Sequence, residues 1–351
     1  MTKIALGNFF EDFYVEQEII HPLPRTITEG EVSLYIALTG SRYALHASEP
    51  FAREVGYEKR PLDDLLMFHL TFGKSVNDVS LNAIANLGYA EVHFVRPVYV
   101  GDTVSLRSKV IGLKENSNGK SGNVYVHSQG YNQHGELILS LKRWVMVKKR
   151  TATMSGIKEI PHFDKVMPTH HPIYLPPIQK VDTTLSGSPY FWEDYVAGER
   201  LNHPEGMTID DSDHTLATKL YQNNAKVHFD HHMMQNTPKK ERLIYGGHII
   251  SLCRSIAHNG FGNAFWFYAI NAGAHANPTY AKDTIYCYSL IKEMIEIERS
   301  DIGLMRVQTI GLKNTTPKEL ASHLDENGAY LDCVVLDLDY TLIVPKKQTK
   351  Q

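Results

Sequence analysis

Three features that the sequence lacks narrow the classes of protein that it can encode. Its only cysteines, Cys253, Cys287 and Cys333, are too few and too scattered for a disulfide scaffold or a cysteine metal site. No apolar run approaches the roughly 18 residues of a membrane-spanning helix, and the N-terminal residues before Gly7 are too few for a signal peptide. A net charge of −3 gives no reason to expect a nucleic acid or a membrane as partner. We therefore expect a cytoplasmic protein.

The sequence does contain a long internal repeat. Residues 7–46 return as residues 189–228 at a constant offset of 182 with no gap. One residue then drops out, and residues 97–99 return as residues 278–280 at an offset of 181. This period is much longer than the roughly 20 to 50 residues of a solenoid repeat, so we interpret it as two homologous domains in tandem. We place the first at 1–150 and the second at 189–351, joined by a proline-rich linker at 151–188.

Each copy is predicted to contain a short helix, a longer helix and then a series of strands. The longer helices are predicted over about 63–74 and 247–259. The predicted strands cover 88–98, 103–113, 122–131, 137–148, 284–298, 305–312 and 329–344. One long helix wrapped by an antiparallel meander resembles the hot-dog fold. The expected fold class is therefore α+β, a tandem or double hot-dog.

The second copy carries a pattern of polar residues and glycines at the start of its long helix. Asn223 stands five residues before His228, and Gly246 and Gly247 follow where the helix is expected to begin. This pattern resembles the MaoC-like family of (R)-specific enoyl-CoA hydratases, whose signature Gly-Asp-x-Asn-Pro-x-His precedes a His-Gly pair that opens the central helix. Asparagine stands here where that family has its aspartate. Four longer stretches resemble the mesaconyl-CoA hydratase family within it, namely 80–91, 112–118, 221–229 and 243–252.

The resemblance implies a hydro-lyase that adds water reversibly to a branched dicarboxylic enoyl-CoA, converting mesaconyl-CoA to β-methylmalyl-CoA. It implies no metal and no cofactor, since coenzyme A is part of the substrate. Three alternatives stay open at this point: a hydratase for another such thioester, for example itaconyl-CoA, a hot-dog acyl-CoA thioesterase, and a non-catalytic acyl-CoA sensor. The expected partner is a small acyl-CoA molecule. Hot-dog folds commonly assemble further, so a homo-oligomer is compatible with the sequence.

The resemblance also assigns roles to the residues of the pattern. His228 is predicted to activate the water, because imidazole near neutral pH can take and return a proton. Asn223 is predicted to orient that water, but an amide is neither acid nor base, so either His228 carries both proton transfers or Asp230 assists. Gly247, with Gly246 beside it, is predicted to present a backbone N–H to the thioester oxygen, because the free N–H groups of a helix N-terminus favour negative charge.

The first copy has lost part of this pattern. It keeps His46, but Ser41 stands five residues before it, and Asp63 and Asp64 replace the glycine pair. Two carboxylates at that helix start would repel a negatively charged oxygen, and Asp63 is predicted to be a simple N-cap. We therefore assign catalysis to the second copy and substrate shaping to the first.

Candidates for binding the substrate's free carboxylate lie near both patterns. Arg42 and Tyr43 stand in the loop before His46, and Arg254 stands one to two turns into the second long helix. An arginine can hold a carboxylate through two parallel hydrogen bonds. The predicted substrate contacts are therefore Arg42, Tyr43, His46 and Arg254.

Two short motifs suggest other functions and are set aside. Asp337 begins a string typical of haloacid-dehalogenase-type phosphatases, but ten residues after Thr341 are too few for such a domain, so we predict a final strand. Gly119, Lys120 and Ser121 look like the end of a phosphate-binding loop, but the earlier glycine is missing, so we predict a hairpin turn.

Overall fold

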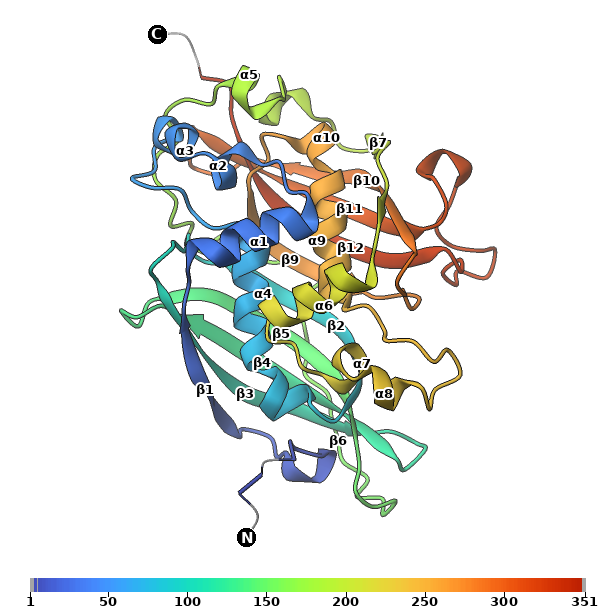
Figure 1. Cartoon of the computed structure of the whole chain (residues 1–351). Helices are drawn as coiled ribbons and strands as arrows, with labels where there is room; N and C mark the ends of the chain where they lie inside the picture. Colours follow the sequence, from blue (N-terminus) through green and yellow to red (C-terminus); the bar gives the residue numbers. More distant parts are fainter. Residues whose placement is uncertain (1–2, 5, 349–351) are drawn as a thin grey trace.

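In the computed structural model, which describes residues 3–4 and 6–348, each copy wraps antiparallel strands around one central helix (Figure 1). The first copy contains the helices α1 Glu29–Thr39, α2 Ala44–Ala47, α3 Glu49–Val55 and α4 Asp64–Lys74, and the strands β1 Glu18–Thr26, β2 Ala83–Phe94, β3 Thr103–Glu115, β4 Ser121–Tyr131 and β5 Leu137–Lys148. The central helix is α4. This arrangement confirms the predicted α+β double hot-dog.

The second copy repeats this order of elements around the central helix α9. Its helices are α6 Asp211–Leu220, α7 Lys226–Phe229, α8 His231–Met234, α9 Gly246–Ile256 and α10 His258–Phe261, and its strands are β7 Arg200–Asn202, β8 Met207–Thr208, β9 Trp266–Ala274, β10 Thr284–Ile295, β11 Ile302–Lys313 and β12 Val334–Pro345. The described residues 151–188 hold two short elements, β6 Lys158–Glu159 and α5 Thr183–Ser186.

All twelve strands among the described residues belong to one antiparallel sheet. Its order is β1-β3-β4-β5-β2-β9-β12-β11-β10-β7, with β6 beside β3 and β8 beside β10. The two copies join at β2 and β9, where Tyr89 lies opposite Gly273 and His93 lies opposite Ala269. The sheet wraps both central helices (Figure 1), and these helices meet where His69 Nε2 of α4 lies 2.8 Å from the Ser251 hydroxyl of α9. One large hydrophobic cluster contains side chains of both copies. Because the copies share this core, it does not separate them into two units, and the domain limits at 150 and 188 stay a prediction.

The strand β9 was not among the predicted strands. The residues of Trp266–Ala274 are buried continuously from Trp266 to Ile270, because β9 lies at the centre of the sheet with core on both faces. Such a strand has no alternation of polar and apolar residues, which is the signal that reveals a half-exposed strand. The long helix of the second copy also ends earlier than predicted, at Ile256, and Gly260 with φ +126° breaks the helical path after it.

Local signals did place the helix starts well. Asp63 accepts a hydrogen bond from the backbone N–H of Leu65 at 2.9 Å, which confirms it as the N-cap of α4. Thr28 and Glu31 form a capping box at the start of α1. The α9 helix begins at Gly246, one residue before its predicted start.

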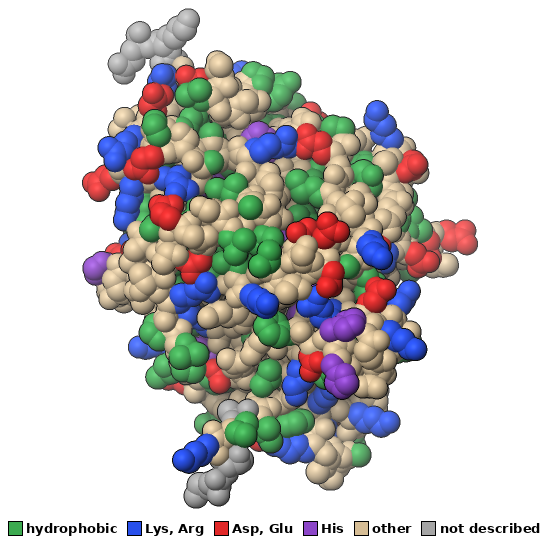
Figure 2. Space-filling model, in the orientation of Figure 1, with side chains coloured by type: hydrophobic (Ala, Val, Ile, Leu, Met, Phe, Trp, Pro, Cys, Tyr) green, Lys and Arg blue, Asp and Glu red, His purple; other side chains and the backbone are tan. Residues whose placement is uncertain are grey.

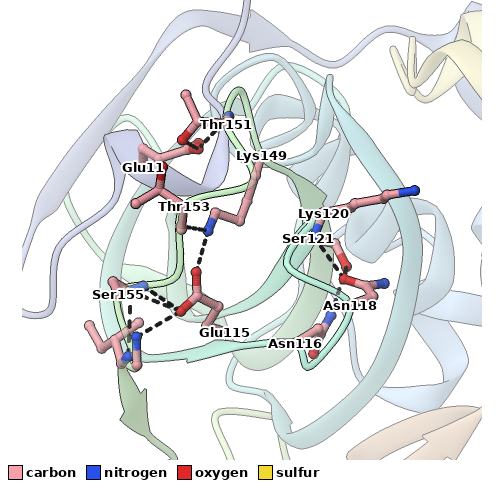
Figure 3. Close-up of polar contacts among 12 residues, drawn as sticks. Glu11, Glu115, Asn116, Asn118, Lys120, Ser121, Lys149, Thr151, Thr153 and Ser155 are labelled. Atoms are coloured by element: carbon pink, nitrogen blue, oxygen red, sulfur yellow. Dashed lines mark hydrogen bonds and ion pairs between the residues drawn. The ribbon is translucent and has the colours of Figure 1, made fainter.

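A buried ion pair ties the start of the linker to the first copy (Figure 3). Glu115 at the end of β3 accepts hydrogen bonds from Lys149 Nζ and, at 2.7 Å each, from the backbone N–H groups of Ser155 and Gly156. Both charged side chains are only 2% exposed. The bond from Lys149 is the main reason that the pKa of Glu115 falls to about 2.

Figure 3 also shows the neighbouring turn between β3 and β4. The backbone N–H of Gly119 donates to the Asn116 carbonyl at 3.0 Å, and Gly119 has a φ of +65°, a conformation that glycine adopts without strain. This confirms the hairpin at residues 119–121. The string that begins at Asp337 lies inside β12, as predicted.

Charges of both signs are mixed over the face shown in Figure 2. No helix of the described residues is long and apolar enough to cross a membrane.

Candidate active site

A cavity of about 210 Å³ lies where the α9 N-terminus of the second copy meets strands of the first. The structure brings three of the predicted site residues to its wall: Asn223, His228 and Gly246. The second copy also contributes His275 and Asn277. The first copy contributes, among others, Phe72, Ser80, Asn86, Tyr89 and Arg143. Both copies therefore build one site.

The His228 ring is held in one orientation by the backbone. Its Nδ1 lies 2.7 Å from the carbonyl oxygen of Leu243, which only accepts, so Nδ1 carries the proton and Nε2 keeps its lone pair. Burial lowers the pKa of His228 to about 4, although the Leu243 carbonyl opposes that shift. The ring is therefore neutral at pH 7, with Nε2 in the state that a general base requires.

Asn223 reaches the cavity through a tight turn after α6. Gln222 has a φ of +55°, and this left-handed residue reverses the chain so that Asn223 faces inward with an exposure of 2%. The Asn223 Oδ1 accepts only a long hydrogen bond, 3.4 Å, from the backbone N–H of Ala225. Its oxygen is therefore weakly engaged and can accept a hydrogen bond from a water in the cavity.

The start of α9 brings backbone very close to the cavity. A Cβ at Gly246 would lie 2.4 Å from the His275 ring, and a Cβ at Gly247 would lie 2.4 Å from the Tyr245 ring. A Cβ at either position would therefore force the neighbouring ring to move. As the first residues of the helix, neither has an intrahelical acceptor for its N–H. Gly246 lines the cavity and Gly247 lies buried behind it, so the donor role predicted for Gly247 stays a prediction that Gly246 shares.

His275 is a second histidine of the site, and no sequence pattern predicted it. It follows β9, lines the cavity, and its ring lies edge-on to Tyr89 with centroids 5.7 Å apart. Its Nε2 has no hydrogen-bond partner among the described residues, and burial lowers its pKa to about 4, with a further lowering by His228. One sequence signal could have revealed it: the two copies differ here, because the position that matches His275 in the first copy is Phe94.

The four predicted substrate contacts lie elsewhere. Arg42 is half exposed and forms an ion pair with Glu205. His46 is buried, with its ring nitrogens 3.3 Å from the Pro61 carbonyl oxygen and 3.2 Å from that of Phe265.

The other two predicted contacts pack on each other. The Arg254 guanidinium lies 4.0 Å above the ring of Tyr43 and donates to the Ala264 carbonyl, while the Tyr43 hydroxyl donates to the Arg254 carbonyl at 3.2 Å. None of the four lines the cavity that holds His228. Their role as substrate contacts stays a prediction, since their proximity to the motif in sequence does not place them at this cavity.

The fold and this site define a double hot-dog protein with a MaoC-like arrangement of histidine, asparagine and glycine-initiated helix. A family model described as mesaconyl-CoA hydratase matches residues 2–319. The β-methylmalyl-CoA dehydratase of Chloroflexus aurantiacus is 48% identical and covers 99% of each chain, and the mesaconyl-CoA hydratase of Cereibacter sphaeroides is 46% identical and covers 98% of this chain and 100% of its own. The chain belongs to the mesaconyl-CoA hydratase family.

Solved structures agree with this membership. A MaoC domain dehydratase from Chloroflexus aurantiacus superposes with a TM-score of 0.96 at 46% identity, over 99% of this chain and 100% of that one. A double hot-dog protein from Mycobacterium tuberculosis superposes with a TM-score of 0.77 over 96% of this chain and 98% of that one. At 21% identity, the second likeness shows the fold alone.

Proposed function

We propose that this protein is a hydro-lyase that interconverts mesaconyl-CoA plus water and β-methylmalyl-CoA. Relatives with these two names match over nearly the full length at 48% and 46% identity. The observation that carries the proposal is the orientation of His228, whose Nδ1 is held by Leu243 so that a neutral Nε2 stands in a cavity with the α9 N-terminus. The substrate is a small CoA thioester, and we propose that the protein acts on it in the cytoplasm.

The reaction needs a base for the water, an acid for the α-carbon and hydrogen-bond donors for the thioester oxygen, and residues of the cavity wall suit each role. The thioester oxygen accepts hydrogen bonds from the N–H groups at the start of α9, where the helix dipole stabilises the enolate that develops on it. A water held by Asn223 Oδ1 gives a proton to His228 Nε2 as its oxygen bonds to the β-carbon. The imidazolium then returns a proton to the α-carbon, so that the product has gained one water.

One histidine suffices for both transfers. Burial disfavours the charged form of His228, as its lowered pKa shows, so the imidazolium gives its proton back readily. The alternative helper, Asp230, caps α8 by accepting the backbone N–H of Met233 at 2.9 Å, and it does not line the cavity. Transfer to and from one nitrogen places the hydroxyl and the proton on the same face of the double bond.

Mass spectrometry of the purified protein with mesaconyl-CoA tests the proposal. The expected product has gained one water and keeps its thioester. Release of free CoA would instead identify a thioesterase, and an unchanged substrate under conditions where the folded protein binds CoA thioesters would reject the proposed reaction.

A further inference from the structure

One charged side chain in the cavity wall has no charged partner. Arg143 in β5 is fully buried, and its guanidinium lies 4.4 Å above the ring of Phe72. Its Nη2 donates to the hydroxyls of Ser75 at 2.8 Å and Ser80 at 2.9 Å. Its hydrogen bonds go to neutral side chains, and no carboxylate among the described residues forms an ion pair with it, although a buried charge is costly without an opposite charge. Burial lowers its pKa to about 10, so it remains charged at neutral pH.

Two buried hydrogen-bond donors beside this charge are unused. The Nη1 of Arg143 donates to Asn86 Oδ1 at 3.3 Å, which fixes the amide so that Nδ2 is its free end. Neither Arg143 Nε nor Asn86 Nδ2 has an acceptor among the described residues. Both residues line the cavity, and its lining includes no aspartate or glutamate. This part of the wall therefore has a positive charge and surplus donors, and it lacks an anionic acceptor.

The repeat shows that the fold does not require this charge. Arg143 lies opposite Tyr89 in the β5–β2 pair, and Tyr340 lies opposite Ile270 in the β12–β9 pair. Tyr89 and Ile270 are 181 residues apart, which is the offset of the repeat in this region. The second copy thus has a neutral tyrosine at the position of Arg143, with its hydroxyl 2.9 Å from that of Thr309. The arginine is specific to the strand that faces the site of His228.

We propose that Arg143 and Asn86 form the subsite for the free carboxylate of the acyl group and make the protein select dicarboxylic CoA thioesters. This deepens the proposed function and rests on it for the nature of the acyl group. The carboxylate accepts hydrogen bonds from Arg143 Nε and Asn86 Nδ2, and such charge-assisted bonds are strong in a dry site.

This placement also assists the proposed reaction. In mesaconyl-CoA the carbon that gains the hydroxyl carries the free carboxylate, so holding the carboxylate also positions that carbon for attack. The guanidinium offsets the negative charge beside the carbon that the water oxygen attacks. Arg143 is thus a substrate-binding residue, distinct from the proton-transferring His228.

Binding of two stable thioesters of equal chain length tests the subsite without relying on turnover. Succinyl-CoA carries the free carboxylate and butyryl-CoA has a methyl group in its place. Titration calorimetry on the wild-type protein is expected to give a Kd for succinyl-CoA at least about 10-fold lower. In Arg143→Gln the two Kd values are expected to become equal within about twofold, with the loss falling on succinyl-CoA. The matched control is Arg306→Gln, since Arg306 is ion-paired to Asp339 and lies outside the cavity lining.

Each result decides for or against the subsite. A wild-type protein with no preference for succinyl-CoA would overturn it, and so would an Arg143→Gln protein that keeps the preference. If Arg143→Gln does not fold, Asn86→Ala replaces it, because Asn86 is only partly buried; a preference unchanged in that variant rejects the subsite. Failure of the wild-type protein to hydrate mesaconyl-CoA, with the succinyl-CoA preference intact, would reject the proposed reaction and leave the subsite standing.

Discussion

Adding one methyl group at Gly246 is expected to damage the site far more than the fold. A Cβ there would lie 2.4 Å from the nearest ring atom of His275 and within 2.6 Å of two others. Ordinary contact begins near 3.4 Å, so the ring or the α9 N-terminus must move by about 1 Å. Overpacking of this kind costs about 1–3 kcal/mol, and a misplacement of about 1 Å at a reacting group lowers rates by about 100-fold.

The assay compares Gly246→Ala with wild type by the rate of mesaconyl-CoA hydration and by thermal unfolding. We expect kcat/KM to fall about 10- to 100-fold, with a modest fall in Tm. Gly30→Ala is the matched control: Gly30 is also in the first turn of a helix, and its Cβ would meet only the Thr28 hydroxyl at 3.6 Å. A Gly246→Ala protein within about twofold of wild type, the scale of a neutral surface change, would refute the placement of the thioester at this helix start.

Two further predictions concern the packing and charge that support the site. Gly73→Ala is expected to lower Tm strongly and to reduce activity, because its Cβ would lie 1.7 Å from the Tyr221 carbonyl oxygen. Tyr221 lies just before the turn that carries Asn223. An unchanged Tm in differential scanning calorimetry would contradict this packing. Acid is expected to destabilise the protein between about pH 6.5 and pH 4. In this range, buried histidines whose pKa falls to about 4 stay neutral in the folded chain but take up protons in the unfolded chain. The folded state is therefore fully stable above the histidine pKa of the unfolded chain and loses stability as the pH falls below it. These histidines include His203 and His248, which are each 1% exposed. Protonating such a ring costs up to about 3 kcal/mol more in the folded chain than in the unfolded one, so urea unfolding should give a lower midpoint at pH 5 than at pH 7. Equal midpoints would show that these rings are not buried as described.

The sequence predicted those parts of the molecule that depend on local signals. The N-cap at Asp63, the glycine pair at Gly246 and the five-residue spacing from Asn223 to His228 are local patterns. The structure brings Gly246, Asn223 and His228 to one cavity. The double hot-dog followed from the repeat and from the order of its elements.

Features that depend on contacts between the copies were not predictable in the same way. Arg143 occupies an ordinary alternating position in a strand, and only the pairing of β5 with β2, and of β2 with β9, brings it to the site of the other copy. His275 follows a strand with no alternation of its own. Arg254 is close to the motif in sequence but does not line the cavity, because its guanidinium packs on the Tyr43 ring and donates to the Ala264 carbonyl inside the core.

We propose that His228 transfers the protons of a hydration reaction in this cavity. The most direct measurement is the rate at which His228→Ala converts mesaconyl-CoA to the hydrated thioester, followed by mass spectrometry, with circular dichroism to establish that the variant is folded. His231→Ala is the control, since His231 is an exposed histidine three residues along the chain, on α8. We expect a loss of at least about 100-fold for His228→Ala and a rate within about twofold of wild type for His231→Ala. A folded His228→Ala protein that hydrates mesaconyl-CoA at a near-normal rate would contradict this proposal.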